Sequence, residues 1–351
     1  MTVSPPPSHS AYVVGKRRAV AAAQFCLGVL SVVVLGAVVW RLIPVREAPP
    51  GWLLVRPPGD TLVVARVGHE VWAGGPEGLF VLPSDVSGEG QRVASAPPFR
   101  QVASINAKPG EVWIAHAQGV SRREGEEWVT YGQQDGLPDA QAWVVLKGRD
   151  GSVWVGTERG LAQREHGSWR VWTTRDGLAA DAATVLHEDR RGRLWVGNGL
   201  TFAGGLSLIE GGRARDLGIA DLPHVMINAI AEDETGGIWV GTGFGSRGGA
   251  CRFSDDGTVR LSKKDGLAGE KVRSIFVGRG GAVWFGSEYD GAARLVANEW
   301  MTLTRSDGLA GSEVKAIVED ASGNLWFASE QGVARCPRAV CAGSASHETR
   351  D

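Results

Sequence analysis

The stretch Leu194-Trp195-Val196-Gly197 is the best guide to the fold of this chain, because close copies of it recur along most of the 351 residues. The other clear copies are Val153-Trp154-Val155-Gly156, Ile238-Trp239-Val240-Gly241, Val283-Trp284-Phe285-Gly286 and Leu325-Trp326-Phe327-Ala328. The full series has its tryptophans at Trp72, Trp113, Trp154, Trp195, Trp239, Trp284 and Trp326, which gives spacings of 41, 41, 41, 44, 45 and 42 residues. A period in this range indicates an array of similar supersecondary units.

Each unit reads as four short strands. Around Trp154 the extended runs are 142–146, 153–156, 161–164 and 169–173. These runs are rich in β-branched and aromatic residues and are bounded by Gly and Asp, which is typical of strands joined by hairpins. Four antiparallel strands in every 41 to 45 residues predict the blades of a β-propeller rather than helical repeats.

The number of units predicts how the ring closes. The Trp strand occurs seven times, but the last unit ends after its third strand, at 332–336. Trp52-Leu53-Leu54-Val55 resembles the fourth strands that begin at Trp128, Trp169 and Trp300. We therefore predict an all-β, seven-bladed propeller of four-stranded antiparallel blades over residues 51–341, closed by this N-terminal strand. Pairing the two ends of the chain leaves no open sheet edge.

Both ends of the chain differ from the repeats in composition. Residues 1–18 are rich in Pro and Ser and end in Lys16-Arg17-Arg18; we expect a disordered cytoplasmic tail. Residues 19–40 carry no charge, and about 20 such residues can cross a bilayer as a helix. We predict a transmembrane signal anchor over 19–43, preceding the propeller and oriented by the cations before it. A linker (44–50) follows it, and 342–351 form a second disordered tail.

A cleaved signal peptide is the alternative for this N-terminal segment, although its apolar core is usually shorter. Both alternatives export the propeller. The anchored form places it on the periplasmic or extracellular side of a bacterial inner membrane, held through residues 19–40.

The repeats resemble a known family in the order of their motifs. Leu-Trp-x-Gly-Thr, Gly-Leu, a Trp strand, Asp-Gly-Leu and Glu-Asp-x-x-Gly-x-Leu-Trp follow one another, and this order resembles the two-component regulator propeller repeat over nearly all of 51–341. The clearest Asp-Gly-Leu copies begin at Asp135, Asp176, Asp265 and Asp307, while Asp221-Leu222-Pro223 is degenerate. The resemblance implies an exported sensory propeller of a bacterial two-component system.

The chain departs from the full-length sensors of that family. It has one set of seven blades, no sandwich domain and no kinase or DNA-binding region, and its apolar segment precedes the propeller. Phosphotransfer within this polypeptide is therefore not expected.

Composition and cysteine usage exclude several partners and cofactors. A net charge of −2 and a pI near 6.4 give no electrostatic footprint for nucleic acid. The seven histidines are scattered among the repeats, so we expect no metal site and no cofactor. Cys336 and Cys341 flank the end of the last blade, where an exported protein can form a disulfide; two free thiols are the alternative.

Two motifs that suggest chemistry are better explained as parts of the repeat. Residues 243–248 spell GxGxxG, but a strand rather than a helix follows, so no helix N-terminus is available for a dinucleotide. His187, Glu188 and Asp189 align with 318–320, which makes them strand-end and turn residues instead of an acid–base set. We predict no catalytic residue.

The repeats differ most in the hairpin that follows each Trp strand. The third-strand Gly comes six positions after Trp154, but ten after Trp195 and Trp239 and seven after Trp284. Alternating strand direction places these three enlarged loops on one face, around a pocket. The candidate ligand-binding residues that they offer are Asn198, Thr201, Phe202, Phe244, Ser246, Arg247, Glu288, Tyr289 and Asp290. Neutral variation in loop length is the alternative.

These observations predict a membrane-anchored, exported propeller that receives signals at the envelope without catalysis. Its partner is expected to be a small ligand such as a glycan or peptide, or an envelope protein such as a separate histidine kinase. The alternatives are an interaction scaffold with no small-molecule site, and a propeller lyase or hydrolase. The lack of a converging acid–base or metal set argues against the enzyme.

Overall fold

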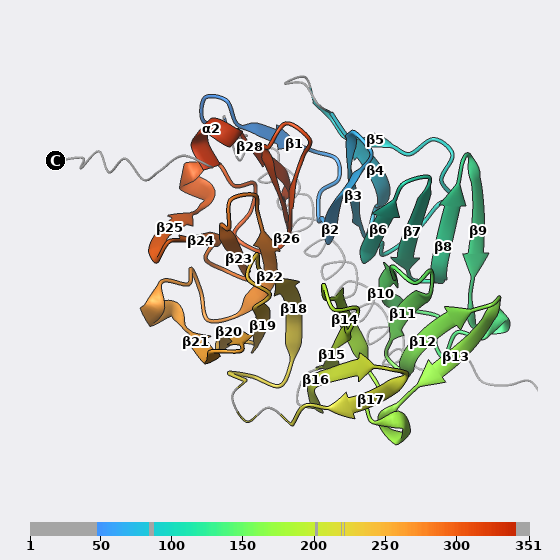
Figure 1. The fold of residues 1–351 in the computed structure, drawn as a ribbon. Coiled ribbons are helices and arrows are strands. Elements are labelled where there is room, and N and C mark those ends of the chain that lie inside the picture. Colours follow the sequence, from blue (N-terminus) through green and yellow to red (C-terminus); the bar gives the residue numbers. More distant parts are fainter. Residues whose placement is uncertain (1–47, 84–87, 201–202, 219, 221, 342–351) are drawn as a thin grey trace, which may run out of the picture. The chain divides into compact units, whose positions relative to one another are not determined.

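The computed structural model describes residues 48–83, 88–200, 203–218, 220 and 222–341. In this part of the chain, seven four-stranded antiparallel sheets follow one another as blades (Figure 1). The first strands of consecutive blades lie side by side around the centre, and the later strands lie progressively further out. The predicted all-β, seven-bladed propeller is therefore confirmed.

Blades 1 to 6 hold their strands in chain order from the inner to the outer edge, and blade 7 takes its outermost strand from the N-terminal side of the propeller. Blade 1 contains β2 (Val63–Val67), β3 (Glu70–Gly75), β4 (Gly78–Leu82) and β5 (Gln91–Arg92); blade 2 contains β6 (Ser104–Lys108), β7 (Glu111–His116), β8 (Gly119–Glu124) and β9 (Glu127–Tyr131); blade 3 contains β10 (Ala142–Lys147), β11 (Val153–Thr157), β12 (Gly160–Glu165) and β13 (Ser168–Trp172). Blade 4 contains β14 (Ala183–Glu188), β15 (Leu194–Leu200), β16 (Ala203–Glu210) and β17 (Arg213–Asp216); blade 5 contains β18 (Ile227–Glu232), β19 (Ile238–Phe244), β20 (Arg247–Ser254) and β21 (Gly257–Leu261). Blade 6 contains β22 (Val272–Val277), β23 (Val283–Ser287), β24 (Ala292–Val296) and β25 (Glu299–Leu303); blade 7 contains β26 (Val314–Glu319), β27 (Leu325–Ser329), β28 (Gly332–Cys336) and, at its outer edge, β1 (Leu53–Val55).

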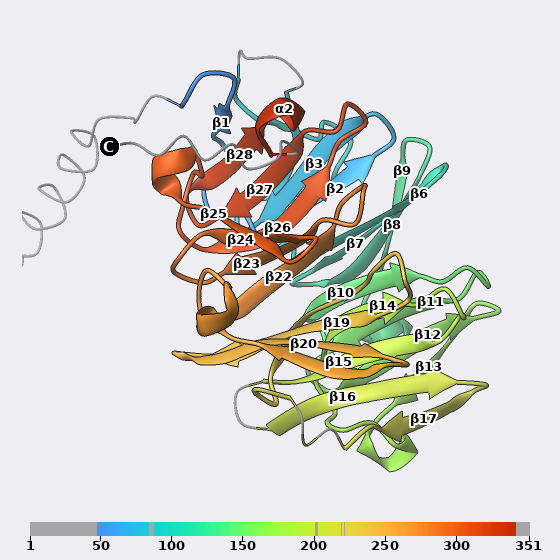
Figure 2. The same cartoon turned by 60° about the vertical axis from the view of Figure 1, so that its left-hand side comes forward.

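The blades have two faces, which we name by their connections. The upper face carries the hairpins between second and third strands and the connections from each blade to the next. The lower face carries the hairpins between first and second strands and, in blades 1 to 6, those between third and fourth strands. Figure 2 shows the stack of blades after a 60° turn.

The repeated tryptophans fill the spaces between blades. Trp113 of blade 2 shares a buried cluster with Val155 of blade 3, and Trp326 of blade 7 shares one with Val64 of blade 1. The ring of Trp284 lies 5.4 Å from that of Phe327 in the following blade, edge to face. Such burial of large rings removes much apolar surface from water at each junction.

Turns on the lower face fix these rings. In blade 5, Asp233 accepts the backbone N–H groups of Thr235 (3.0 Å) and Gly237 (2.9 Å) with Oδ1. Its Oδ2 accepts the indole N–H of Trp239 at 3.0 Å. Blades 4 and 7 repeat the indole contact through Asp189 and Asp320, both at 2.9 Å. One carboxylate thus shapes the Asp-x-x-Gly turn and orients the tryptophan six residues later.

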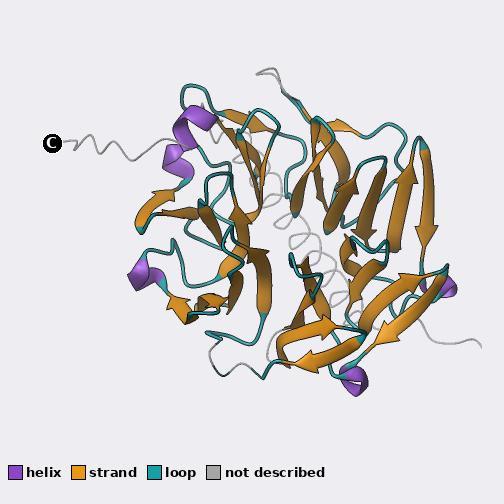
Figure 3. Cartoon of the chain, viewed as in Figure 1, coloured by secondary structure: helices purple, strands orange, loops and turns teal. Residues whose placement is uncertain are grey.

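The Asp-Gly-Leu connections form short 3₁₀ helices at the periphery, coloured purple in Figure 3. They are η1 (Gln133–Asp135), η2 (Thr174–Asp176), η3 (Lys263–Asp265) and η4 (Arg305–Asp307). In η4 the Asp307 carboxylate accepts the N–H of Thr304 at 2.9 Å, and Gly308 follows with a φ of 126° that favours glycine. The next residue, Leu309, is buried in the core. The motif therefore caps, turns and anchors each connection.

The N-terminal strand lies against the last blade. β1 pairs antiparallel with β28, with Leu53 opposite Arg335. A Cβ on Gly308 would lie 2.5 Å from the ring of Trp52, just as one on Gly266 would lie 2.4 Å from Trp300 in blade 6. Trp52 thus occupies the position of an outer-strand tryptophan.

The chain beyond blade 7 is short in the described part. α2 (Arg338–Cys341) follows β28, and Cys336 and Cys341 are joined by a disulfide, with their Cα atoms 6.1 Å apart. Within the described residues, no helix has the length and apolar character needed to span a bilayer. The predicted tails and the predicted transmembrane segment 19–43 lie outside them.

Candidate functional site

The sequence predicts enlarged loops between the second and third strands of blades 4, 5 and 6. In blades 4 and 5 the structure differs from this prediction. Their extra residues lengthen the strands, so that Leu200 pairs with Ala203 and Phe244 with Arg247 at the tips. The long strands β16 and β20 are visible in Figure 2. In blade 6 the extra residue lies in a true loop between β23 and β24. The longer ladders thus extend the paired strands of these two hairpins at the upper face.

Asn198 is built into the fold. Its side-chain N–H groups are donated to the carbonyls of Ala180 (2.8 Å) and Ala182 (3.3 Å). Its Oδ1 accepts the Ser207 hydroxyl at 2.6 Å, and the residue is fully buried. The same position, three residues after the Trp, holds a buried polar residue in five other blades: His116, Thr157, Thr242, Ser287 and Ser329. Alignment on the Trp could have identified this structural role.

Thr201 and Phe202 lie outside the described residues. The remaining six predicted residues belong to blades 5 and 6. Phe244, Ser246 and Arg247 are exposed at the tip of the blade 5 hairpin, while Tyr289 and Asp290 are exposed in the blade 6 loop beside the half-buried Glu288.

Lys271, which sequence reasoning missed, connects these two hairpins. It precedes β22, is only 8% exposed and forms an ion pair with Glu288. Its ammonium group lies 5.9 Å from the ring centre of Phe244, and the Tyr289 hydroxyl donates to Glu288 at 2.9 Å. Phe244 (39% exposed) and Tyr289 (64%) are thus held above one buried ion pair.

We call Phe244, Arg247, His224, Lys271, Glu288 and Tyr289 the blade 5–6 rim. Burial alone would raise the pKa of Glu288, but the bonds from Lys271 and Tyr289 outweigh it and lower that pKa. Burial lowers the pKa of His224, and the charges of Arg247 and Lys271 lower it further. The rim therefore combines an ionised carboxylate, two cations and a neutral imidazole at neutral pH.

β-Bulges on the inner strands connect neighbouring blades near the upper face. In blades 3 to 7 the inner strand carries a bulge near its start, which re-aims the bulged side chain. In blade 5 Asn228 donates to Val272 O of blade 6 at 3.0 Å. Arg273 of blade 6 pairs with Glu313 at 3.0 Å, and Lys315 of blade 7 pairs with Asp60 of blade 1 at 2.5 Å. In blades 5 to 7 the bulged residue thus contacts the following blade.

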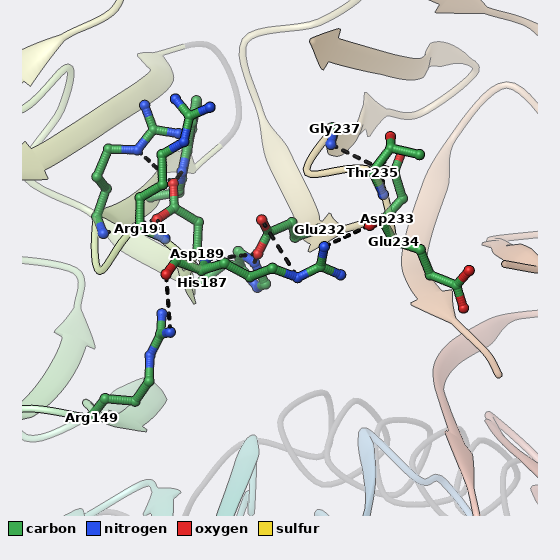
Figure 4. Close-up of polar contacts among 12 residues, drawn as sticks. Arg149, His187, Asp189, Arg191, Glu232, Asp233, Glu234, Thr235 and Gly237 are labelled. Carbon is green, nitrogen blue, oxygen red and sulfur yellow. Dashed lines mark hydrogen bonds and ion pairs between the residues drawn. The ribbon is translucent and has the colours of Figure 1, made fainter. Parts of the chain in front are cut away.

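The lower face carries a different polar network, whose charged side chains hold neighbouring blades together (Figure 4). Arg149 of blade 3 lies 3.3 Å from Glu188 of blade 4. Arg190 of blade 4 donates its backbone N–H to Glu232 of blade 5 at 2.8 Å. Burial lowers the pKa of His187, against the raising effect of Glu232.

These contacts agree with the prediction from the sequence that His187, Glu188 and Asp189 are strand-end and turn residues. Asp189 is held by Arg193 at 2.6 Å and by Trp195. The described residues contain no group of three or more His, Cys, Asp or Glu side chains arranged to hold a metal ion.

Pockets open on the lower face between neighbouring blades of the described part of the chain. One, of about 540 Å³, lies between blades 7 and 1 and is lined by Trp326 and Glu70, among others. One of about 270 Å³ lies between blades 4 and 5, beside Trp195. A third, of about 190 Å³, lies between blades 2 and 3, beside Trp113.

Comparisons with known proteins identify the repeat. Residues 221–244 and 308–331 match the family model described as Two component regulator propeller. No curated protein matches the sequence significantly.

Several solved structures share the fold. The extracellular domain of a protein described as a hybrid two component system from B. thetaiotaomicron is 17% identical, with a TM-score of 0.64 over 80% of this chain and 40% of that one. A second domain from that organism, described as part of a one component system, is 14% identical, with a TM-score of 0.65 over 81% and 39%. This chain therefore spans about two fifths of either domain. Virginiamycin B lyase from Staphylococcus aureus, solved with Quinupristin, is 16% identical, with a TM-score of 0.63 over 82% and 99%.

At these identities the structures show a shared fold, while the family model matches the repeat itself. Two stretches of the chain thus match the two-component regulator propeller repeat, and the resemblance read from its sequence is confirmed.

Proposed function

We propose that this protein is a non-catalytic sensory module of bacterial envelope signalling, with the blade 5–6 rim as its receiving surface. The observation that carries the proposal is the pair of exposed aromatic rings, Phe244 and Tyr289, over the buried Lys271–Glu288 ion pair. In the described part of the chain, Phe244 and Tyr289 are the only aromatic residues among the exposed large hydrophobic side chains.

The chemistry of the rim fits a ligand with both apolar faces and hydroxyl or amide groups. Aromatic rings offer stacking surfaces, and Arg247, with its planar guanidinium, offers several donors in one plane. The Lys271–Glu288 ion pair holds both rings in place before a ligand binds. Little side-chain mobility is therefore lost on binding, which favours affinity. A glycan or a short peptide has this combination of groups.

The rest of the proposal concerns location and closure. The uncharged run 19–40 would anchor the chain in the inner membrane and leave the propeller on the periplasmic side, where a separate histidine kinase is the expected envelope partner. The pairing of β1 with β28 and the ion pair Lys315–Asp60 support a ring closed by the N-terminal strand. A closed ring holds the rim at a fixed geometry relative to such a partner.

A thermal-shift screen of the full chain in mild detergent against glycans and peptides tests the receiving surface. A ligand that binds the native state raises the apparent melting temperature. We expect Arg247→Ala and Tyr289→Ala to weaken a stabilising ligand at least tenfold. Val259→Ala, at an exposed position on the outer strand of blade 5, should leave affinity unchanged.

Other outcomes would favour the alternatives. Unchanged affinity in both rim variants would remove the rim from the proposal. Absence of any stabilising ligand, together with an envelope protein that co-purifies, would favour a scaffold. Turnover of a screened compound, abolished by one side-chain change, would show an enzyme.

A further inference from the structure

The indole N–H groups of the repeated tryptophans have acceptors in four blades. Trp195, Trp239 and Trp326 donate to Asp189, Asp233 and Asp320, as described above. Trp72 of blade 1 donates to Glu70 at 2.8 Å. A carboxylate beside the indole is therefore the usual arrangement at the lower end of a blade.

Trp113 of blade 2 breaks this pattern. Its ring is 1% exposed, and its Nε1 has no hydrogen-bond partner among the described residues. Glu111 stands two residues before it, as Glu70 stands before Trp72. Glu111 is instead engaged by Arg122, with Nε and Oε1 2.6 Å apart, and by Lys147 at 3.7 Å. A buried donor without an acceptor is costly, so an acceptor from outside the chain would stabilise it.

Trp113 lines the 190 Å³ pocket between blades 2 and 3, and cations surround the same space. Arg122, Lys147 and Arg164 line it with three positive charges, and Glu111 is the one carboxylate in the lining; Glu124, outside the lining, also pairs with Arg122 at 2.7 Å. The Arg164 Nε is buried and has no hydrogen-bond partner among the described residues. Its guanidinium stacks 4.3 Å from the ring centre of Tyr131. Stacking on a ring face leaves the in-plane N–H groups of a guanidinium available to a planar anion.

The pocket between blades 4 and 5 shows the contrast. There Arg193 and Arg252 face Asp189 and Asp233 at 2.6 Å. The indole of Trp195 is satisfied, and Asp255 and Asp256 add further negative charge. Equivalent grooves in one propeller thus differ in the charge that a ligand would meet. Cations outnumber carboxylates around Trp113, whereas each arginine beside Trp195 already has an aspartate partner.

We propose that the pocket between blades 2 and 3 is a binding site for a carboxylate group, accepted by the Trp113 indole N–H and the Arg164 guanidinium. A carboxylate is planar, matches the guanidinium edge and can accept from two donors at once. The pocket volume suits a small acid or the terminal carboxylate of a peptide. This site lies on the face opposite to the blade 5–6 rim and does not depend on it.

Indole N–H resonances of the full chain, labelled with ¹⁵N-tryptophan in detergent, test the proposal. Trp113→Phe keeps an aromatic ring and removes the donor, so it assigns the Trp113 signal. We expect succinate, and a peptide with a free C-terminal carboxylate, to shift that signal saturably. The same peptide with an amidated C-terminus should not shift it, whereas succinate alone would identify a small acid as the ligand.

Two arginine variants distinguish binding at this pocket from a general effect of positive charge on the protein surface. Arg164→Gln should weaken binding at least tenfold, while Arg191→Gln, in the groove between blades 4 and 5, should leave it unchanged. Trp113→Phe leaves a cavity at the junction between blades 2 and 3 and should lower the melting temperature, so it serves only to assign the Trp113 signal. A Trp113 signal that does not respond to either probe, or equal losses from Arg164→Gln and Arg191→Gln, would overturn the proposal.

Discussion

The two ends of strand β19 in blade 5 are in opposite situations. At the lower end, Trp239 is buried and its N–H is bound by Asp233, which also binds Arg252. At the upper end, Phe244 is exposed and contacts Lys271 from the next blade. The lower end follows the repeat, and the upper end departs from it. Recurring residues therefore hold blades together, while residues that interrupt the repeat supply the surface.

The largest effect on stability is expected at the lower end. Burial would raise the pKa of Asp233, but its bonds to Arg252, Thr235 and the turn lower it to about 2. Asp233→Ala leaves the Trp239 N–H and the Arg252 guanidinium without their acceptor. We expect the free energy of unfolding to fall by about 3 kcal/mol, measured by urea unfolding of the full chain in detergent.

Asp256→Ala is the control for this variant, because Asp256 is exposed in a turn of the same blade. It should change stability by less than about 0.5 kcal/mol. Equal losses from the two substitutions would contradict the structural role of the lower end.

A change in pH is expected to have an effect of intermediate size on stability, through a histidine at the upper end of blade 2. His116 takes the position of Asn198 and Thr242, is 2% exposed and contacts Ser121 at 2.8 Å. Burial lowers the pKa of His116 from 6.5 to about 4. The unfolded state therefore binds its proton first, so this stability is present above pH 6.5 and is lost as pH falls toward 4.

We expect up to about 3 kcal/mol to be lost over this window, before most carboxylates titrate. Urea unfolding at about pH 7 and about pH 4.5 measures it. In His116→Gln the fall should shrink to the contribution of the other groups. If His116→Gln loses as much unfolding free energy as the parent over this pH range, a group other than His116 is responsible.

The smallest effect on stability is expected at the blade 5–6 rim. Tyr289→Ala removes an exposed ring whose hydroxyl donates to Glu288. We expect a change in unfolding free energy below about 0.5 kcal/mol, even where ligand binding is lost. A loss as large as that of Asp233→Ala would show that the rim is part of the framework and would remove the contrast between the two ends.

The repeat spacing was enough to predict the strand order, the number of blades and the structural role of the tryptophans. It succeeded because each Trp, Gly and Asp has a local role. The Trp fills a junction, Gly308 takes a positive φ, and Asp233 closes a turn. Position in the repeat thus determines contacts. The place of Trp52 followed for the same reason, since it matches other outer-strand tryptophans.

The candidate site was predicted less well from the sequence. Counting residues after the Trp located blades 5 and 6, but it included Asn198, whose polar groups are used within blade 4. It also missed Lys271, since a lysine before a strand has no distinctive pattern until the next hairpin lies beside it.

The propeller follows from the sequence alone, because periodic residues repeat the same local geometry and burial in every blade. Which side chains from different blades meet is known only from the tertiary structure. The Lys271–Glu288 pair under Phe244 and the indole of Trp113 without an acceptor both depend on the junction between two blades. Hydrogen bonds and ion pairs act over a few ångströms, so such sites are set by neighbours in space that are distant in the chain, as Phe244 is from Lys271 and Trp113 is from Arg164.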